Sequence, residues 1–168
     1  MPYTVLDLLF PRSCAVCGAG RPEAGRYLCA DCFSSLAFIK DPVCTVCGHP
    51  IGGAVEGGYR CPSCTRRPPA FGRARALGRY DGVLGALVQQ VKYRRASWLA
   101  PDLGRWMTLA ARVWYGRNGF DAVVPVPLYR RRQRERGFNQ AALLAAEVAA
   151  ALELPLAARL LKRVRDTR

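Results

Sequence analysis

Eight cysteines stand in four Cys-X-X-Cys pairs within the first 64 residues, and no cysteine follows them. Two thiolates separated by two residues can bind one metal ion from a single tight turn, and two such pairs complete the tetrahedral sulfur site of structural zinc. The sequence therefore predicts two Zn2+ ions. Their candidate ligands are Cys14, Cys17, Cys29, Cys32, Cys44, Cys47, Cys61 and Cys64.

The cysteine pairs belong to an internal repeat. Cys14-Ala-Val-Cys17-Gly18 recurs as Cys44-Thr-Val-Cys47-Gly48, and a second pair follows in each copy. A glycine after the leading pair suits a turn of positive φ, which lets backbone amides point at sulfur. Each copy therefore predicts one zinc ribbon. Because shorter loops close at lower entropic cost, ligation within each copy is favoured over an interleaved arrangement, and His49 is expected in a turn.

Other uses of cysteine pairs fit this sequence less well. Disulfides require a secreted chain, yet residues 1–10 contain no basic segment and place Asp7 inside their apolar stretch. Four pairs at matched spacing argue against a redox motif. No apolar run approaches the ~20 residues that span a membrane. We therefore expect a cytoplasmic protein without membrane insertion.

The formal net charge is +14, and it is distributed unevenly. Residues 1–70 carry +2, residues 71–120 carry +7 and residues 121–168 carry +5. Eight thiolates and two Zn2+ ions together add −4, so the metallated chain retains about +10. A positive field beyond the ribbons suits polyanions such as nucleic acid or a phosphate-rich small molecule. On charge alone, a basic surface that only keeps the protein soluble stays open as the alternative.

Composition divides the chain near residue 70. Residues 3–10 predict a short helix that Pro11 ends, and the two ribbons follow it. Pro68 and Pro69 disfavour regular structure and mark a linker. We therefore expect one domain over residues 1–70, made of the N-terminal helix and a double zinc ribbon, and a second domain over residues 71–168.

The second domain has the pattern of an α/β fold. Alternating polarity predicts strands, apolar residues at helical spacing predict helices, and Asn139 is a suitable helix cap. The expected elements are an edge strand over 71–80, helices over 83–91 and 99–114, a buried parallel strand over 121–127, a helix over 140–152 and a further strand over 156–164.

An arginine-rich segment from Leu128 to Phe138 separates a predicted strand end from the start of a predicted helix, and we expect it to be a loop. In α/β sheets, ligands bind at the carboxyl ends of strands. Backbone amides at a helix start and the guanidinium groups favour a phosphate or pyrophosphate at this position. A solvated basic loop is the alternative interpretation.

Three features resemble the ComF family, whose members combine zinc ribbons with a domain like the type I phosphoribosyltransferases. They are the paired Cys-X-X-Cys ribbons, Val91-Lys92-Tyr93, and Val124-Pro-Val-Pro-Leu128 followed by Arg136-Gly-Phe-Asn-Gln140. The resemblance covers essentially residues 4–168. It implies a small N-terminal double zinc ribbon followed by an α/β domain with an incomplete type I phosphoribosyltransferase-like parallel sheet.

The resemblance also implies a role in natural transformation, in handling incoming single-stranded DNA, with a protein of the competence machinery as a further partner. The residues that it places at a pyrophosphate pocket are Arg136, Gly137, Asn139 and Gln140. The basic candidates for DNA contact are Lys92, Tyr93, Arg94, Arg130, Arg131, Arg132 and Arg134. Aromatic residues that could stack on bases beside them are Trp98, Tyr115 and Phe138.

One part of the transferase site has no counterpart here. Type I phosphoribosyltransferases bind phosphoribosyl pyrophosphate (PRPP) and Mg2+ with a strand that ends in two adjacent acidic residues, followed by a Thr/Gly-rich phosphate loop. This sequence has no two adjacent acidic residues and ends at Arg168 before such a strand, so we expect a truncated, inactive transferase domain. Three hypotheses remain: single-stranded DNA binding, phosphoribosyl transfer with PRPP and Mg2+ in a completed domain, and a zinc-ribbon module that binds a protein.

Overall fold

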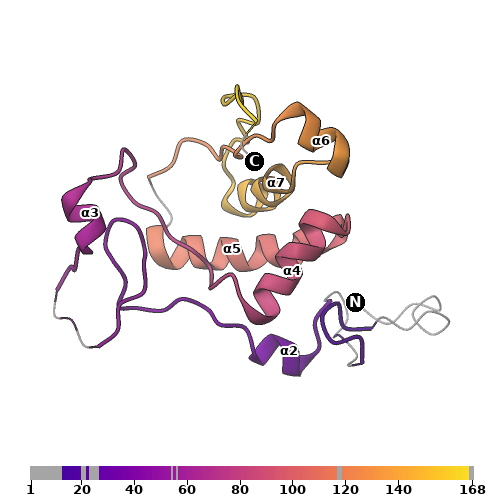
Figure 1. Cartoon of the computed structure of the whole chain (residues 1–168), viewed down its shortest axis with the longest axis horizontal. Coiled ribbons are helices and arrows are strands. Elements are labelled where there is room, and N and C mark those ends of the chain that lie inside the picture. The colour runs from indigo at the N-terminus through magenta and orange to yellow at the C-terminus, as the bar shows by residue number, and fades with distance from the viewer. Residues whose placement is uncertain are drawn as a thin grey trace.

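The computed structural model describes residues 13–19, 22, 27–53, 55, 57–116 and 119–166. The helix predicted over residues 3–10 lies outside them. The helical elements, shown in Figure 1, are α2 (Ala30–Ser34), α3 (Pro62–Arg66), α4 (Gly82–Tyr93), the 3-10 helix η1 (Ser97–Leu99), α5 (Ala100–Tyr115), α6 (Arg130–Arg136) and α7 (Gln140–Leu152).

Helices α4 and α5 form the centre of the molecule, as their apolar spacing predicts. Leu84, Leu87 and Val91 recur on one face of α4 and pack in one cluster with Leu103 and Trp106 of α5. All five side chains are buried. The helices predicted over residues 83–91 and 99–114 are confirmed, since burial of these apolar faces stabilises them.

Helix α7 packs along α5, and its start is fixed by a side-chain cap. The Oδ1 atom of Asn139 accepts a hydrogen bond from the Ala141 amide at 3.0 Å, and its Nδ2 atom donates to the Val126 carbonyl at 3.1 Å. A cap of this kind satisfies an amide that has no partner inside the helix. The predicted helix over residues 140–152 and its Asn139 cap are confirmed.

The segment predicted as a basic loop contains a helix, so that prediction is wrong. Helix α6 forms because arginine has good helical propensity and because Glu135 pairs with Arg131 at 3.2 Å and with Arg132 at 3.3 Å. Gly137 ends it with a φ of +85°, and its amide donates to the Gln133 carbonyl at 2.9 Å. The arginines therefore project from a defined helical surface.

Within the described ranges, the predicted strands reduce to single bridges. Val123 and Leu156 form one parallel bridge, in which the Val123 amide donates to the Pro155 carbonyl at 2.8 Å. Pro125 and Pro127 have no amide hydrogen and cannot extend this ladder. The predicted edge strand over 71–80 is limited to an antiparallel bridge between Gly78 and Phe38. The described residues therefore show a helical arrangement with one parallel bridge, not the expected sheet.

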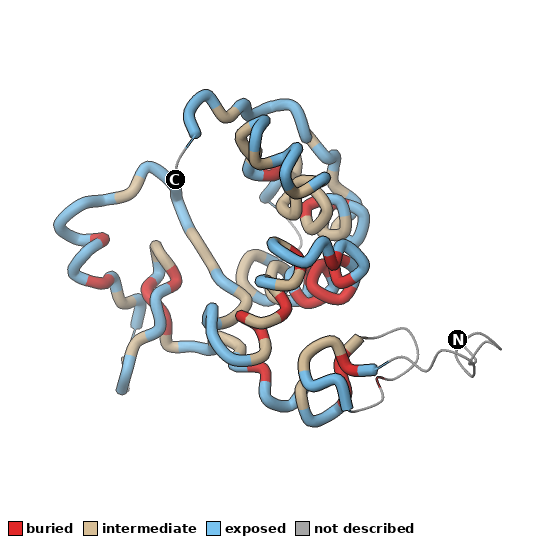
Figure 2. The backbone as a smooth tube through the Cα atoms, turned by 45° about the vertical axis from the view of Figure 1, so that its right-hand side comes forward, coloured by how far each residue is buried: buried red, intermediate tan, exposed pale blue. Residues whose placement is uncertain are grey.

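The two cysteine repeats pack differently. Cys14 and Cys29 of the first repeat, here called the first ribbon, belong to the same buried cluster as α4 and α5. Cys44, Cys61 and Cys64 of the second repeat, the second ribbon, form a separate buried cluster. Figure 2 shows this second group of buried positions apart from the helical core. The predicted boundary near residue 70 stays a prediction.

Candidate metal centres and nucleic-acid interface

The eight cysteines gather into two groups of four, one in each ribbon. The groups are Cys14, Cys17, Cys29 and Cys32, and Cys44, Cys47, Cys61 and Cys64, and the sulfur atoms of each group lie within 4.8 Å of one another. The grouping is sequential and not interleaved.

The sulfur spacing within both groups fits tetrahedral zinc. The Sγ atoms of Cys17 and Cys29 lie 3.8 Å apart, and those of Cys47 and Cys61 lie 3.7 Å apart. A tetrahedron with Zn–S bonds of about 2.3 Å has sulfur–sulfur edges of about 3.8 Å. The protein therefore offers two structural zinc sites, as the sequence predicts, and His49 belongs to neither group.

A glycine closes the leading turn of each site. Gly18 has a φ of +72° and Gly48 a φ of +71°, and their amides donate to the carbonyls of Cys14 and Cys44 at 2.9 Å each. These conformations confirm the glycine prediction, since a residue with a Cβ is strained at positive φ. At Gly48 a Cβ would also lie 2.7 Å from the Ala74 carbonyl oxygen.

Backbone amides stabilise a thiolate at the first cysteine of each site. The Cys61 amide donates to the Cys44 sulfur at 3.3 Å, and this bond, together with the weaker effects of the Cys47 and Val46 amides, lowers the pKa of Cys44 to about 6 despite burial. At Cys14 burial pushes the pKa upward, but hydrogen bonds from nearby amides, Cys17 first, outweigh it and bring the pKa to about 6. Hydrogen bonds to the charged form favour that form.

The last cysteine of each site has a raised pKa instead of a lowered one. Burial raises the pKa of Cys32 to about 12, and thiol hydrogen bonds with the other ligands of its group add to the effect. Burial likewise raises the pKa of Cys64 to about 12. Before metal binds, each group thus holds a thiolate at one end and a proton at the other, and a metal ion must displace that proton.

Zinc affinity is therefore expected to rise with pH. Cys32 and Cys64 keep their protons across the neutral range, so each binding event releases at least one proton and affinity increases by about tenfold or more per pH unit. Acidification returns these protons and releases the metal. Competition with a chromophoric chelator between roughly pH 6.5 and 8 measures the slope. An affinity that does not change over this range would contradict the assignment.

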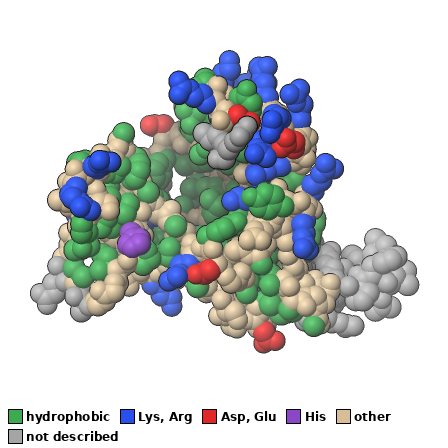
Figure 3. All heavy atoms as spheres, in the orientation of Figure 1, with side chains coloured by type: hydrophobic (Ala, Val, Ile, Leu, Met, Phe, Trp, Pro, Cys, Tyr) green, Lys and Arg blue, Asp and Glu red, His purple; other side chains and the backbone are tan. Residues whose placement is uncertain are grey.

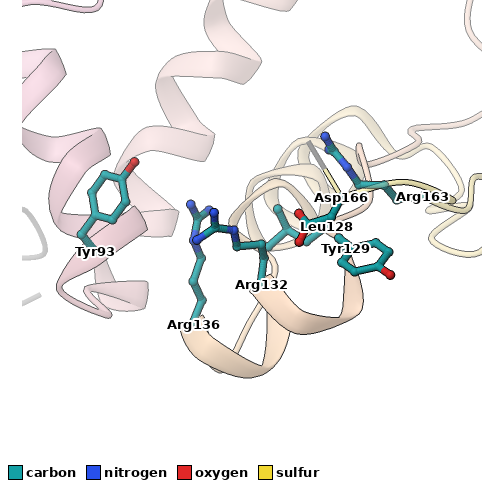
Figure 4. Close-up of a pocket in the computed structure, with 7 residues that line it drawn as sticks. All are labelled: Tyr93, Leu128, Tyr129, Arg132, Arg136, Arg163 and Asp166. Carbon is teal, nitrogen blue, oxygen red and sulfur yellow. The ribbon is translucent and has the colours of Figure 1, made fainter. Parts of the chain in front are cut away.

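A pocket of about 270 Å3 lies beside α6 and brings basic and aromatic side chains together. Figure 4 shows Arg132 and Arg136 extending from α6 toward the space that Tyr93 of α4 borders. The complete lining consists of Tyr93, Leu128, Tyr129, Arg132, Arg136, Arg163 and Asp166. Guanidinium groups beside an exposed aromatic ring suit a nucleotide, since they offer donors to phosphate and a stacking face to a base.

Contacts on both sides hold Arg136 in place. Its guanidinium carbon lies over the Tyr93 ring, 5.5 Å from the centroid, and its Nη1 atom donates to Oε1 of Gln140 at 3.0 Å. The Tyr93 residue is 71% exposed, so part of its ring remains accessible. Across the pocket, Nη1 of Arg163 donates to the Pro127 carbonyl at 3.4 Å. The site therefore combines positioned positive charge with an available aromatic surface.

The structure brings only some of the predicted site residues into this pocket. Of the pyrophosphate candidates, Arg136 lines it, Gly137 ends α6, Asn139 caps α7 and Gln140 accepts the hydrogen bond from Arg136. Of the DNA-contact candidates, Tyr93 and Arg132 line it. Figure 3 shows Lys and Arg side chains gathered over α6 and the nearby C-terminal segment.

The remaining candidates lie outside the pocket. Arg94, Arg130, Arg131 and Arg134 are exposed, and the Lys92 ammonium lies 4.9 Å from the centroid of the Tyr80 ring. The aromatic candidates have intramolecular partners: Trp98 lies against Tyr27 with ring centroids 4.5 Å apart, Tyr115 lies against Phe120 at 5.2 Å, and Phe138 packs on the main core.

Sequence reasoning missed four residues of the lining: Leu128, Tyr129, Arg163 and Asp166. A usable signal existed for Arg163. It stands near the carboxyl end of the strand predicted over residues 156–164, and the carboxyl ends of neighbouring parallel strands meet at one edge. The parallel bridge between Val123 and Leu156, and the hydrogen bond from Arg163 to the Pro127 carbonyl, bring that segment beside the residues that lead into α6.

Comparisons with known proteins give consistent results. Residues 5–68 match the model of the double zinc ribbon domain. Competence protein F of Haemophilus influenzae is 29% identical over 155 residues, which cover 84% of this chain and 68% of that protein. DNA utilization protein YhgH of Salmonella typhi is 31% identical over 163 residues, which cover 95% of this chain and 70% of that protein.

This chain covers a smaller part of a further relative than of the two above. DNA utilization protein YhgH of Escherichia coli (strain K12) is 32% identical over 140 residues, which cover 82% of this chain and 60% of that protein. The chain thus spans about 60% to 70% of the length of these relatives. No solved structure matches. No helix in the part of the chain that the structure describes has both the length and the apolar character to cross a membrane.

Proposed function

Because the chain belongs to the ComF family, with competence protein F and DNA utilization protein YhgH among its relatives, we propose that it acts in DNA uptake by binding single-stranded DNA. The observation that carries the proposal is the convergence of Arg132 and Arg136 of α6 with Tyr93 of α4 in one pocket. The two zinc sites have a structural role and do not take part in DNA binding directly.

The pocket suits one nucleotide of a flexible strand. Arg132 and Arg136 offer guanidinium donors to a phosphate, and such charge-assisted bonds are stronger than bonds between neutral groups. Arg136 lies over the Tyr93 ring, and the exposed part of this ring can stack on an unpaired base. Exposed arginines along α6, Arg130 and Arg134 among them, extend the positive surface for neighbouring phosphates.

A second candidate function is phosphoribosyl transfer by a completed domain. The parallel bridge between Val123 and Leu156, with a basic pocket beside it, supports this alternative because a parallel sheet of that type would include such a contact. In the same proposal, residues 71–168 are the N-terminal part of such a domain. The absence of two adjacent acidic residues in the sequence argues that this chain does not bind PRPP by itself.

One titration distinguishes the two candidates. A fluorescent oligonucleotide should bind the protein with an affinity that falls as salt rises, because phosphate contacts release counterions. The same sequence as a duplex should bind more weakly, since its bases cannot stack on Tyr93. PRPP with Mg2+ should not displace the oligonucleotide. Absence of binding, or salt-independent binding, would overturn the first proposal, and displacement at micromolar PRPP would favour the second.

A further inference from the structure

The first ribbon is attached to both central helices through its ligand-bearing turns. The side-chain amide of Gln90 in α4 donates to the Ala15 carbonyl, which lies between the ligands Cys14 and Cys17. Asp102 in α5 accepts a hydrogen bond from the Tyr27 amide at 3.0 Å, two residues before the ligand Cys29. Each half of the first zinc site is therefore bonded to a different helix.

Burial strengthens the Asp102 attachment, and apolar packing supports the ribbon as a whole. Asp102 is only 6% exposed, and a buried carboxylate is costly unless it is hydrogen-bonded. Cys14 and Cys29 share one apolar cluster with Leu87 and Leu99, which are each 1% exposed. A metal ion held by both halves of this ribbon would therefore also restrain α4 relative to α5.

The second ribbon is attached elsewhere. Within the described residues, it is bonded to the segment that follows Pro69: the Ala74 amide donates to the Val46 carbonyl at 2.7 Å, and Arg75 donates to the Thr45 carbonyl at 3.2 Å. The Arg75 guanidinium lies 5.0 Å from the centroid of the Trp114 ring, at the carboxyl end of α5. Figure 1 shows the second ribbon at that end, away from α4 and α6.

The attachment of the first ribbon lies close to the proposed DNA site. Gln90 and Tyr93 belong to the last turn of α4, and they are about one helical turn apart. We propose that zinc in the first ribbon, and not zinc in the second, holds Tyr93 in position, with Gln90 and Asp102 as the positioning residues. The link to DNA affinity rests on the proposed function, whereas the link to α4 does not.

Two ligand variants test whether the first zinc site, and not the second, restrains α4. Cys17→Ser and Cys47→Ser change equivalent positions, the second cysteine of each leading pair, and each should reduce the zinc content from two ions to one. In Cys17→Ser, amide hydrogen exchange across residues 88–93 should accelerate by roughly tenfold or more because the end of α4 loses its restraint. In Cys47→Ser, exchange in that segment should stay within about twofold of the wild type, since the hydrogen bonds of the second ribbon, among the residues that the structure describes, lead to Ala74 and Arg75 and not to α4.

The DNA readout is separate from the exchange readout. Cys17→Ser should weaken single-stranded DNA binding by about tenfold, and Cys47→Ser should leave it unchanged. If the wild type binds no DNA, the proposed function fails, and the exchange data still decide the zinc coupling. Equal exchange in α4 for both variants, or full protection of α4 in Cys17→Ser, would overturn the coupling.

A third variant tests the same coupling without removing a zinc ligand, in case Cys17→Ser unfolds globally. Gln90→Met keeps the length of the side chain, removes its amide donor and leaves all eight ligands in place. It should retain two zinc ions and still accelerate exchange over residues 88–93, by roughly threefold or more. Asp102→Ala, which removes the acceptor of the Tyr27 amide, should also accelerate exchange over residues 88–93, and Asp102→Asn, which keeps an acceptor, should restore most of the protection. If Gln90→Met exchanges like the wild type, Gln90 is not a positioning residue and the proposal fails.

Discussion

Replacing Arg132 and Arg136 together by alanine is expected to weaken single-stranded DNA binding by about 100-fold, since each lost charge-assisted bond contributes about 1.5 kcal/mol. Both side chains line the pocket, and Arg136 also lies over Tyr93. Fluorescence anisotropy at one fixed salt concentration measures the loss. Circular dichroism should be unchanged, because the exposed pair of Arg132 with Glu135 adds little to stability.

The same helix supplies the matched control. Arg130 and Arg134 are exposed and do not line the pocket, and their replacement by alanine removes the same amount of charge. This double variant should lose less than about tenfold in affinity, through reduced counterion release alone. If the two double variants lose affinity equally, net charge accounts for binding and the pocket does not.

Replacing Gly104 by alanine is expected to destabilise the protein by about 2 kcal/mol, because α5 and α7 are too close at this point to admit a methyl group. A Cβ at Gly104 would lie 2.3 Å from the Cβ of Glu147, an atom that a change of rotamer cannot move away. The helices would have to separate, and the hydrogen bond from Arg112 to the Ala151 carbonyl, now 2.7 Å, would lengthen. Denaturant unfolding of the zinc-loaded protein measures the change.

Gly85 is the corresponding control in α4. It is also helical and buried, but a Cβ there would lie 3.4 Å from the nearest atom, the Tyr80 carbonyl carbon, which is an ordinary contact. Gly85→Ala should therefore stabilise the protein by about 0.5–1 kcal/mol through better helical propensity. Stabilisation by both substitutions would show that α5 and α7 are not packed as closely as the structure indicates.

The sequence predicted the features that depend on local chemistry. Ligand spacing identifies the zinc sites because two cysteines in one turn are sufficient for half of a site. The central helices follow from apolar spacing, and the start of α7 follows from the Asn139 side chain, which bonds to an amide two residues away. Each of these signals lies within a few residues along the chain.

The sequence did not predict features that depend on distant or competing contacts. At α6 two signals compete: a run of arginines suggests a solvated loop, whereas the pairing of Glu135 with Arg131 one turn away favours a helix. The first ribbon is attached through two pairs of residues, Tyr27 with Asp102 and Ala15 with Gln90. The members of each pair are 75 positions apart in the sequence, so no local pattern predicts them. For the same reason, Pro68 and Pro69 indicate a linker without revealing that the core includes residues on both sides of it.

The proposed DNA site is tested by comparing the single-stranded DNA affinity of Tyr93→Ala with that of Tyr80→Ala. Both tyrosines are exposed, and each lies beside a cationic side chain, Arg136 for Tyr93 and Lys92 for Tyr80, but only Tyr93 lines the pocket. Tyr93→Ala should lose about tenfold in affinity for the single strand, since one stacked base contributes about 1–3 kcal/mol, and Tyr80→Ala should bind like the wild type. Wild-type affinity in Tyr93→Ala would show that the pocket beside α6 does not bind the single strand.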